Sequence, residues 1–270
     1  MDICSFVRSF QRHSHLSDEE IFNLKELKLS YNKLTFLPES IEELSNLEKL
    51  DLTDNQLSSL PESIGKLSNL QRLFLYKNQL TSLPESIGKL NRLKELCLSF
   101  NRLTSLPESF GNLNNLESLL LPSNKLTSLP ESFDNLNNLQ TLSLSCNQLS
   151  SLPESFGNLS KLQRLYLADN QLSSLPESIG KLSNLERLYL SNNQLSSLPE
   201  SIGDLSNLER LWSENNQLND QAKSVLKTLV MTNSKIKDLL TDNFDFSKEL
   251  DRNVRGESAP GRTTIKSAEY

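Results

Sequence analysis

Leucine recurs along the chain in the pattern LxxLxL, and an asparagine follows each copy three positions later. The asparagines stand 23 residues apart, at Asn32, Asn55, Asn78, Asn101, Asn124, Asn147, Asn170, Asn193 and Asn216. Self-similarity at a fixed period of this length is typical of stacked-repeat architectures. We therefore divide residues 24–218 into nine repeats, of which the ninth is degenerate.

Each repeat predicts one short strand followed by a turn to the opposite side of the molecule. In LERLYLSNNQLSSLPESIGDLSN, residues 185–207, the alternate leucines of LxxLxL point inward, as the two-residue period of a strand requires. Successive strands then stack as a parallel sheet, about 4.8 Å apart. Proline fixes φ and removes a donor, so the Leu-Pro step ends the extended pattern. An inward column follows the proline, and we interpret it as core rather than as a cofactor slot: Ile41, Ile64, Ile87, Phe110, Phe133, Phe156, Ile179 and Ile202.

These coincident positions resemble the leucine-rich repeat family, in its 23-residue form of the Ras-associated and bacterial types. The resemblance implies an α/β solenoid with a curved parallel sheet on its concave face and short helical or irregular segments on its convex face. It also implies a ladder of hydrogen bonds made by the repeated asparagine side chains, which the spacing alone only permits.

The two ends depart from the repeat. Residues 1–23 place four apolar residues at helical spacing, and Ser17 with Glu20 has the signature of a capping box, which predicts an N-terminal helical cap. In the ninth repeat, Ser213 replaces an inward leucine. Apolar residues between Val225 and Leu240 then return to helical spacing. We predict a C-terminal helical cap over residues 219–250 and a flexible tail over residues 251–270.

The composition agrees with a thin, stacked core. Hydrophobic residues make up 36% of the 270, with 8 glycines in addition, which is below the usual 45–50%. The net charge of −6 argues against a general nucleic-acid binder, and no apolar run approaches the roughly 18 residues of a membrane span. Three scattered cysteines and an N-terminus without a signal-peptide pattern lead us to expect a soluble, cytoplasmic protein. The helical caps argue against self-association through the ends, so we expect a monomer.

The outward columns of the sheet carry the differences between repeats. Counted from the first leucine, positions 1, 2, 4, 6 and 7 supply 45 of the 270 residues, so a random placement of the six tyrosine and tryptophan residues would put one of them there. Five lie there: Tyr31, Tyr76, Tyr166, Tyr189 and Trp212. Tyrosine, tryptophan and arginine are the side chains enriched in binding hot spots.

We therefore predict two partner-binding patches on the concave face. The first, the C-terminal patch, is a row of three aromatic residues beside a row of three arginines: Tyr166, Tyr189 and Trp212 with Arg164, Arg187 and Arg210. The second, the N-terminal patch, consists of Arg72, Phe74, Tyr76, Phe100 and Leu120. Small polar residues separate the two patches: Thr141, Ser143 and Ser145.

A structural interpretation of the same residues stays open. Aromatic residues favour strands in any case, and arginine can stack on tyrosine merely to cover it. Lys28, Asp51 and Ser143 occupy the same column as the aromatic row, however, so the scaffold itself does not require aromatic residues there.

Other chemistry finds less support in the residues. The only histidines, His13 and His15, precede the repeats, so we expect no enzyme activity, no metal and no cofactor. Cys97 is either a reactive thiol or, as we prefer, a small filler. The repeated glutamate after each proline is either a metal ladder or, as we prefer, a solvated face. The basic residues of the N-terminal segment leave a membrane contact as an alternative there: Arg8, Arg12, His13 and His15.

The resemblance also implies a function. Similar uniform arrays occur in leucine-rich effectors that intracellular bacterial pathogens inject into host cells, and these proteins bind other proteins through the concave face. We therefore expect a non-enzymatic protein-interaction module with a host protein as its partner, secreted into the host cytoplasm. An adaptor that recruits a partner to a separate enzyme of the ubiquitin or small-GTPase pathways, and an endogenous cytosolic scaffold, are the alternatives.

Overall fold

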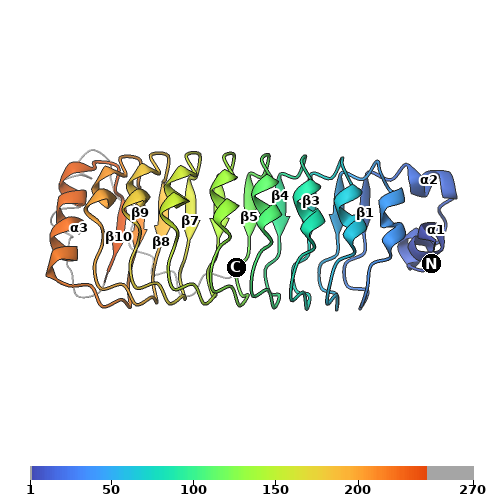
Figure 1. The fold of residues 1–270 in the computed structure, drawn as a ribbon, viewed down its shortest axis with the longest axis horizontal. Helices are drawn as coiled ribbons and strands as arrows, with labels where there is room; N and C mark the ends of the chain where they lie inside the picture. The colour runs from blue at the N-terminus through green and yellow to red at the C-terminus, as the bar shows by residue number, and fades with distance from the viewer. Residues whose placement is uncertain (1, 242–270) are drawn as a thin grey trace.

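The computed structural model describes residues 2–241, which form one row of stacked repeats (Figure 1). Ten short strands make a single sheet, and each pairs in parallel with the next along the chain. The strands are β1 (Glu26–Lys28), β2 (Lys49–Asp51), β3 (Arg72–Phe74), β4 (Glu95–Cys97), β5 (Ser118–Leu120), β6 (Thr141–Ser143), β7 (Arg164–Tyr166), β8 (Arg187–Tyr189), β9 (Arg210–Trp212) and β10 (Asp238–Leu240). The predicted solenoid is confirmed.

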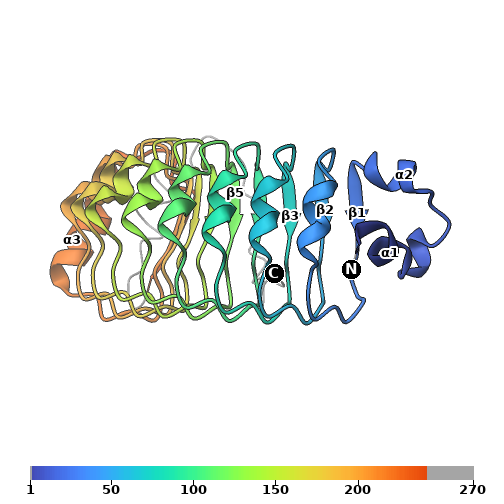
Figure 2. The ribbon, with the colours of Figure 1, turned by 45° about the vertical axis from the view of Figure 1, so that its right-hand side comes forward.

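A row of short 3₁₀ helices lies on the other side of the molecule from the sheet (Figures 1 and 2). Each helix begins directly after the proline of its Leu-Pro step. This proline has an extended backbone conformation and is the N-cap residue of the helix. The helices are η2 (Glu39–Glu43), η3 (Glu62–Lys66), η4 (Glu85–Lys89), η5 (Glu108–Asn112), η6 (Glu131–Asn135), η7 (Glu154–Asn158), η8 (Glu177–Lys181) and η9 (Glu200–Asp204).

The two sides of the stack have different spacings. On the 3₁₀ side, the ring centroids of Phe110 and Phe133 are 6.3 Å apart, and those of Phe133 and Phe156 are 6.5 Å apart. On the sheet side, the rings of Tyr166 and Tyr189 stack at 4.8 Å. Because successive repeats stand farther apart on the 3₁₀ side, the stack curves and the sheet becomes its concave face.

The core is a column of leucines one repeat wide, closed on one side by asparagines. Asn55 is 6% exposed; its Oδ1 accepts from the backbone N–H of Leu34 at 2.9 Å, and its Nδ2 donates to the carbonyl of Leu29 at 2.8 Å. The later repeats reproduce this geometry up to Asn216. The ladder is thus confirmed from the second repeat onward. Asn32 is exposed because no earlier repeat offers it carbonyls to satisfy.

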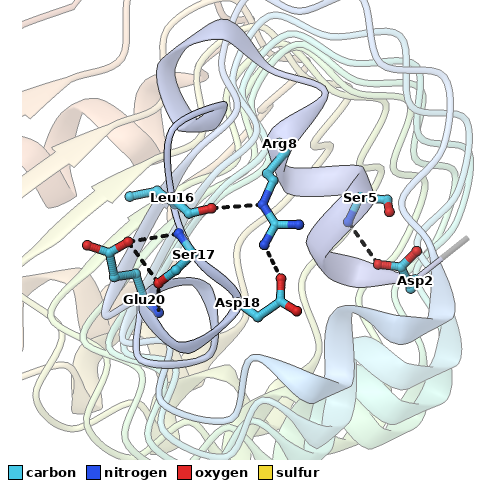
Figure 3. A network of polar contacts seen from close by, with 7 residues as sticks. All are labelled: Asp2, Ser5, Arg8, Leu16, Ser17, Asp18 and Glu20. Carbon is cyan, nitrogen blue, oxygen red and sulfur yellow. Dashed lines mark hydrogen bonds and ion pairs between the residues drawn. The ribbon is translucent and has the colours of Figure 1, made fainter.

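The N-terminal cap contains α1 (Ile3–Arg8), η1 (Gln11–His13) and α2 (Asp18–Phe22). The predicted capping box is present: Ser17 N–H donates to Glu20 Oε2 at 2.8 Å, and Glu20 N–H donates to Ser17 Oγ at 3.2 Å (Figure 3). Arg8 donates to the carbonyl of Leu16 and pairs with Asp18. His13 is buried and bonds the carbonyl of Lys28 at 3.0 Å. Two of the four basic residues of this segment therefore hold the cap together, which favours a structural role over a membrane contact.

Within the described residues, the C-terminal cap contains one helix, α3 (Asp220–Thr232), and the prediction that helix continues over residues 233–241 is wrong. Leu239 lies in β10, opposite Leu211 of β9. The spacing from Ile236 to Leu239 matches the start of LxxLxL, and β9 would otherwise expose unpaired backbone groups at the sheet edge. The rest of the predicted cap and the tail, residues 242–270, lie outside the described residues. No helix between residues 2 and 241 is both long and apolar enough to span a membrane.

Candidate functional site

Each strand of the repeats buries its middle residue and turns its two flanking residues toward the concave face. In β7, Leu165 is fully buried, whereas Arg164 and Tyr166 are half-buried. The parallel register then aligns equivalent residues across strands, so that Tyr166 lies opposite Tyr189 and Tyr189 lies opposite Trp212. The structure therefore brings the six predicted residues of the C-terminal patch together as two rows.

The aromatic row is continuous and ordered by ring contacts. The rings of Tyr166 and Tyr189 stack with an interplanar angle of 7°, and the ring of Trp212 meets that of Tyr189 edge-on at 4.6 Å. Tyr189 is only 8% exposed because its neighbours cover both of its sides. The surface that a partner can touch thus belongs to Tyr166 and Trp212, while Tyr189 holds them apart.

Within the described residues, the arginine row forms no ion pair with an acidic residue. Among residues 2–241, Arg164, Arg187 and Arg210 enter no ion pair, and Arg187 Nε is buried without a hydrogen-bond partner. Within the described part of the chain, the one cation close to the face of an aromatic ring is Lys49, whose Nζ is 5.6 Å from the Phe74 centroid. The arginines therefore do not serve to cover the tyrosines, which weakens the structural interpretation of this patch.

The N-terminal patch is looser. Tyr76 and Phe100 make an edge contact with centroids 5.3 Å apart, and Phe100 is 45% exposed. Phe74 and Leu120 are half-buried on strands two steps apart, with Cys97 between them. Arg72 is exposed at the start of β3. Two of the residues that separate the patches are buried, since Ser143 is 5% and Ser145 2% exposed.

The prediction from sequence missed one residue of the C-terminal patch. Asp238 of β10 lies in register with Arg210, and its Oδ2 accepts a hydrogen bond of 3.1 Å from Trp212 Nε1. This bond fixes the indole at the end of the aromatic row. The strand spacing of Ile236 and Leu239 is the signal that could have placed Asp238 on the concave face.

A second missed feature is a column of left-handed backbone. The seventh position after the first leucine has positive φ in every repeat: Tyr31, Asp54, Lys77, Phe100, Ser123, Cys146, Asp169, Asn192 and Asn215. Asparagine and aspartate tolerate this conformation, whereas bulky residues adopt it at a cost. Tyr31 and Phe100 are therefore placed on the concave rim against their backbone preference.

The remaining candidates have structural explanations. Cys97 is half-buried with its Sγ 3.5 Å from Ser99 Oγ. Five of the glutamates after the prolines accept hydrogen bonds from the next repeat, as when Glu62 Oε2 accepts from Ser86 N–H at 3.3 Å. The hydrogen bonds from Ser63 likewise lower the pKa of Glu39. Residues 2–241 contain no cluster of His, Cys, Asp and Glu arranged to hold a metal.

Solved structures of other proteins share this architecture. A leucine-rich repeat protein of Leptospira interrogans is 37% identical, with a TM-score of 0.79 over 87% of this chain and 61% of its own. The repeat domain of FLRT2, in a complex with latrophilin 3 and Unc5D, is 32% identical, with a TM-score of 0.67 over 82% of this chain and 70% of its own. The plant peptide hormone receptor RGFR1, in complex with RGF2, is 28% identical, with a TM-score of 0.56 over 82% of this chain and 45% of its own.

The chain thus spans about three fifths of the Leptospira protein, and no curated protein matches its sequence. The family described as leucine-rich repeat region matches residues 2–105 and 108–241. These two matched segments span nearly all of the residues from which the sheet, the asparagine ladder and both patches are built. The chain belongs to the leucine-rich repeat family.

Proposed function

We propose that this protein is a non-enzymatic binding module that captures one protein partner on its concave face. The observation that carries the proposal is the ordered aromatic row beside arginines that have no acidic partner in the described fold. Exposed aromatic area next to unpaired guanidinium groups is the chemistry of binding hot spots. FLRT2 and RGFR1, which share the architecture, were solved in complexes with protein and peptide partners.

We further propose that the protein is a monomeric bacterial effector that acts on a host protein in the host cytoplasm. This proposal is supported by the likeness of the repeats to injected leucine-rich effectors and the 37% identity to a Leptospira protein. The absence of catalysis is supported by the positions of the histidines. His13 is buried in the N-terminal cap, which lies at the opposite end of the stack from the C-terminal patch (Figure 1).

The test replaces the accessible aromatic residues of the C-terminal patch by serine, the residue that the chain itself carries at Ser143 of the same column. Tyr166→Ser with Trp212→Ser should weaken capture of a partner from host lysate by about a hundredfold or more, since hot spots contribute about 2 kcal/mol each or more. Phe36→Ser is the matched control, because Phe36 is 51% exposed and other repeats carry serine there, as at Ser59. Equal capture by the folded double variant would refute the assignment of the site.

An adaptor is the second candidate function, favoured by the separation of the two patches. Buried serines lie between them, and the N-terminal patch lacks a row of arginines. If Phe74→Ser with Phe100→Ser loses one captured protein and Tyr166→Ser with Trp212→Ser loses another, the module joins two proteins. Loss of the same protein by both variants contradicts the adaptor.

A further inference from the structure

Three arginines lie side by side on neighbouring strands at the C-terminal end of the concave face. Arg164 is in register with Arg187, and Arg187 with Arg210. All three side chains are half-buried, and Arg187 Nε is buried without a partner. Because like charges directly opposite one another destabilise a sheet, this row has a free-energy cost that the described fold does not recover.

The scaffold does not require arginine in this column. At its N-terminal end, Lys49 Nζ pairs with Glu26 on the neighbouring strand at 2.7 Å. Farther along, Ser118 and Thr141 occupy the same column without charge. Both neutral residues and alternating charges are therefore compatible with the stack.

Two acidic residues beside the row have other partners. Asp238 accepts from Trp212 Nε1 at 3.1 Å, and Glu209 pairs with Lys237 at 3.1 Å. Glu186, which precedes Arg187, is within ion-pair distance of none of the three arginines in the described fold. The row therefore offers its charge to a partner. The acidic side chains beside the row would repel the phosphates of a nucleic acid, so they disfavour a nucleic acid as the partner.

The distance between successive side chains of a row indicates which secondary structure of a partner would match it. Equivalent side chains recur along the stack at one strand spacing, as the ring separations of 4.8 and 4.6 Å show. One face of an α-helix repeats every 5.4 Å, so a helix lying along the stack stays near register over three repeats. Side chains on one face of an extended strand repeat every ~6.7 Å and fall out of register by about 4 Å over the same length.

We propose that the C-terminal patch binds one amphipathic α-helix of a protein partner, which places a stripe of carboxylates on Arg164, Arg187 and Arg210 and an adjacent apolar stripe on Tyr166 and Trp212. The inference rests on the proposed function and specifies its partner. Arg187 is the central contact, because it lies between the other two arginines.

The test measures binding of a short labelled helical peptide to the full chain by fluorescence anisotropy. The peptide carries glutamate at positions i, i+4 and i+7 and leucine one position after each, with both termini blocked. The control peptide replaces each glutamate by glutamine. We expect the glutamate peptide to bind about tenfold more tightly or better, because hydrogen bonds between charged groups are the strong ones, and added salt to reduce the difference.

Variants of the protein locate the contact. Arg187→Gln should weaken binding of the glutamate peptide about tenfold or more, and Arg187→Lys should recover part of the loss, since lysine keeps the charge but not the planar fork. Arg102→Gln removes the same charge from an exposed position four repeats away and should change binding less than twofold. Circular dichroism confirms that each variant is folded.

Three outcomes would overturn the inference: equal binding of the two peptides, no effect of Arg187→Gln, and tighter binding of a proline-interrupted peptide of the same composition. Binding of a single-stranded oligonucleotide in place of the peptide would assign the row to polyanions and also overturn it. The proposed function is judged separately. If Tyr166→Ser with Trp212→Ser abolishes partner capture while the acidic peptide does not bind, the acidic helix is refuted and the binding module stands.

Discussion

At the scale of single residues, the left-handed column shows where side-chain identity and backbone preference disagree. Asn192 and Asn215 suit their positive φ, whereas Tyr31 (φ 62°) and Phe100 (φ 56°) do not. A bulky residue in this conformation costs about 1–2 kcal/mol. Residues kept at such positions are candidates for function rather than for stability.

Tyr31→Asn should therefore raise the free energy of unfolding by about 1 kcal/mol, measured by urea denaturation. Tyr31 is 74% exposed, so little packing is lost. Phe100→Asn is the informative comparison, because it also removes the contact with Tyr76, worth about 0.5–1.5 kcal/mol, and should give a smaller gain or none. A loss of stability in Tyr31→Asn would show that the tyrosine packs better than its exposure indicates.

Cys146 belongs to the same left-handed column, and the pKa of its thiol shows how a neighbouring charge acts there. Burial, and then the neighbouring Asp169, raise the pKa of this thiol above its ordinary value, although the side chain is exposed. Only the thiolate reacts with an alkylating reagent, so we expect slow labelling near neutral pH and a steep rise as the pH approaches the raised pKa. Asp169→Asn removes a negative charge that opposes ionisation, which should lower the pKa and speed labelling at pH 8. An unchanged rate would mean that Asp169 does not influence the thiol.

At the scale of elements, the 3₁₀ helices are stacked through glycines. A Cβ at Gly180 would lie 2.3 Å from the carbonyl oxygen of Ser201 in the next repeat, and four other glycines of this column meet the same obstacle. Asp134 replaces the glycine in the fifth repeat, where Asn158 Nδ2 bonds its carboxylate at 3.0 Å. The residue at this one position of each 3₁₀ helix therefore determines how closely the helix can pack against the next repeat.

Gly180→Ala should lower the free energy of unfolding by about 1–3 kcal/mol through overpacking. Gly203→Ala is a matched control at the same place in the following helix, because nothing lies within 4 Å of its Cβ position; it should be neutral or add about 0.5 kcal/mol by restricting the unfolded chain. Thermal denaturation of the two variants side by side decides the matter. Equal effects would mean that the stack adjusts to the extra carbon.

At the scale of the whole molecule, residues 2–241 form a one-dimensional stack with a cap at each end. Ile21 of α2 is fully buried in the N-terminal cap, as are Ile3 and Val7. At the other end, β10 covers the edge of β9 and Asn233 bonds the carbonyl of Leu205 at 2.9 Å. In such stacks each repeat contacts only its neighbours, so stability is a sum of local terms.

Ile21→Ala should therefore loosen the N-terminal repeats more than the rest, with a local cost of about 2–5 kcal/mol for the lost side chain. Hydrogen exchange should accelerate in β1 and β2 and stay unchanged in β7 and β8. Leu142→Ala in β6 is the comparison variant. Because β6 lies in the middle of the stack, hydrogen exchange should accelerate in the repeats on both sides of it. Uniform acceleration in Ile21→Ala would show that the stack unfolds as a single unit.

Much of the fold follows from the sequence alone, for a physical reason. A repeat of 23 residues predicts the strand, the Leu-Pro step and the inward column by local periodicity, and stacking repeats the result in each unit. The same spacing permits the asparagine ladder, which the family resemblance implied. The same periodicity indicates that Arg187 and Tyr189 face the same side. The tenth strand escaped the prediction because its pattern is short and follows a helix.

The sequence by itself thus determined the architecture and the face on which the two patches lie. Only the tertiary structure decided that Tyr189 is enclosed by its neighbours, that Asp238 holds Trp212, and that the three arginines lack an acidic partner within the described fold. Inward positions repeat with the period of the backbone, whereas enclosure and charge pairing depend on which side chains adjacent repeats bring together. Such contacts arise between residues 23 or more positions apart, as between Tyr166 and Tyr189, and exist only once the repeats are stacked.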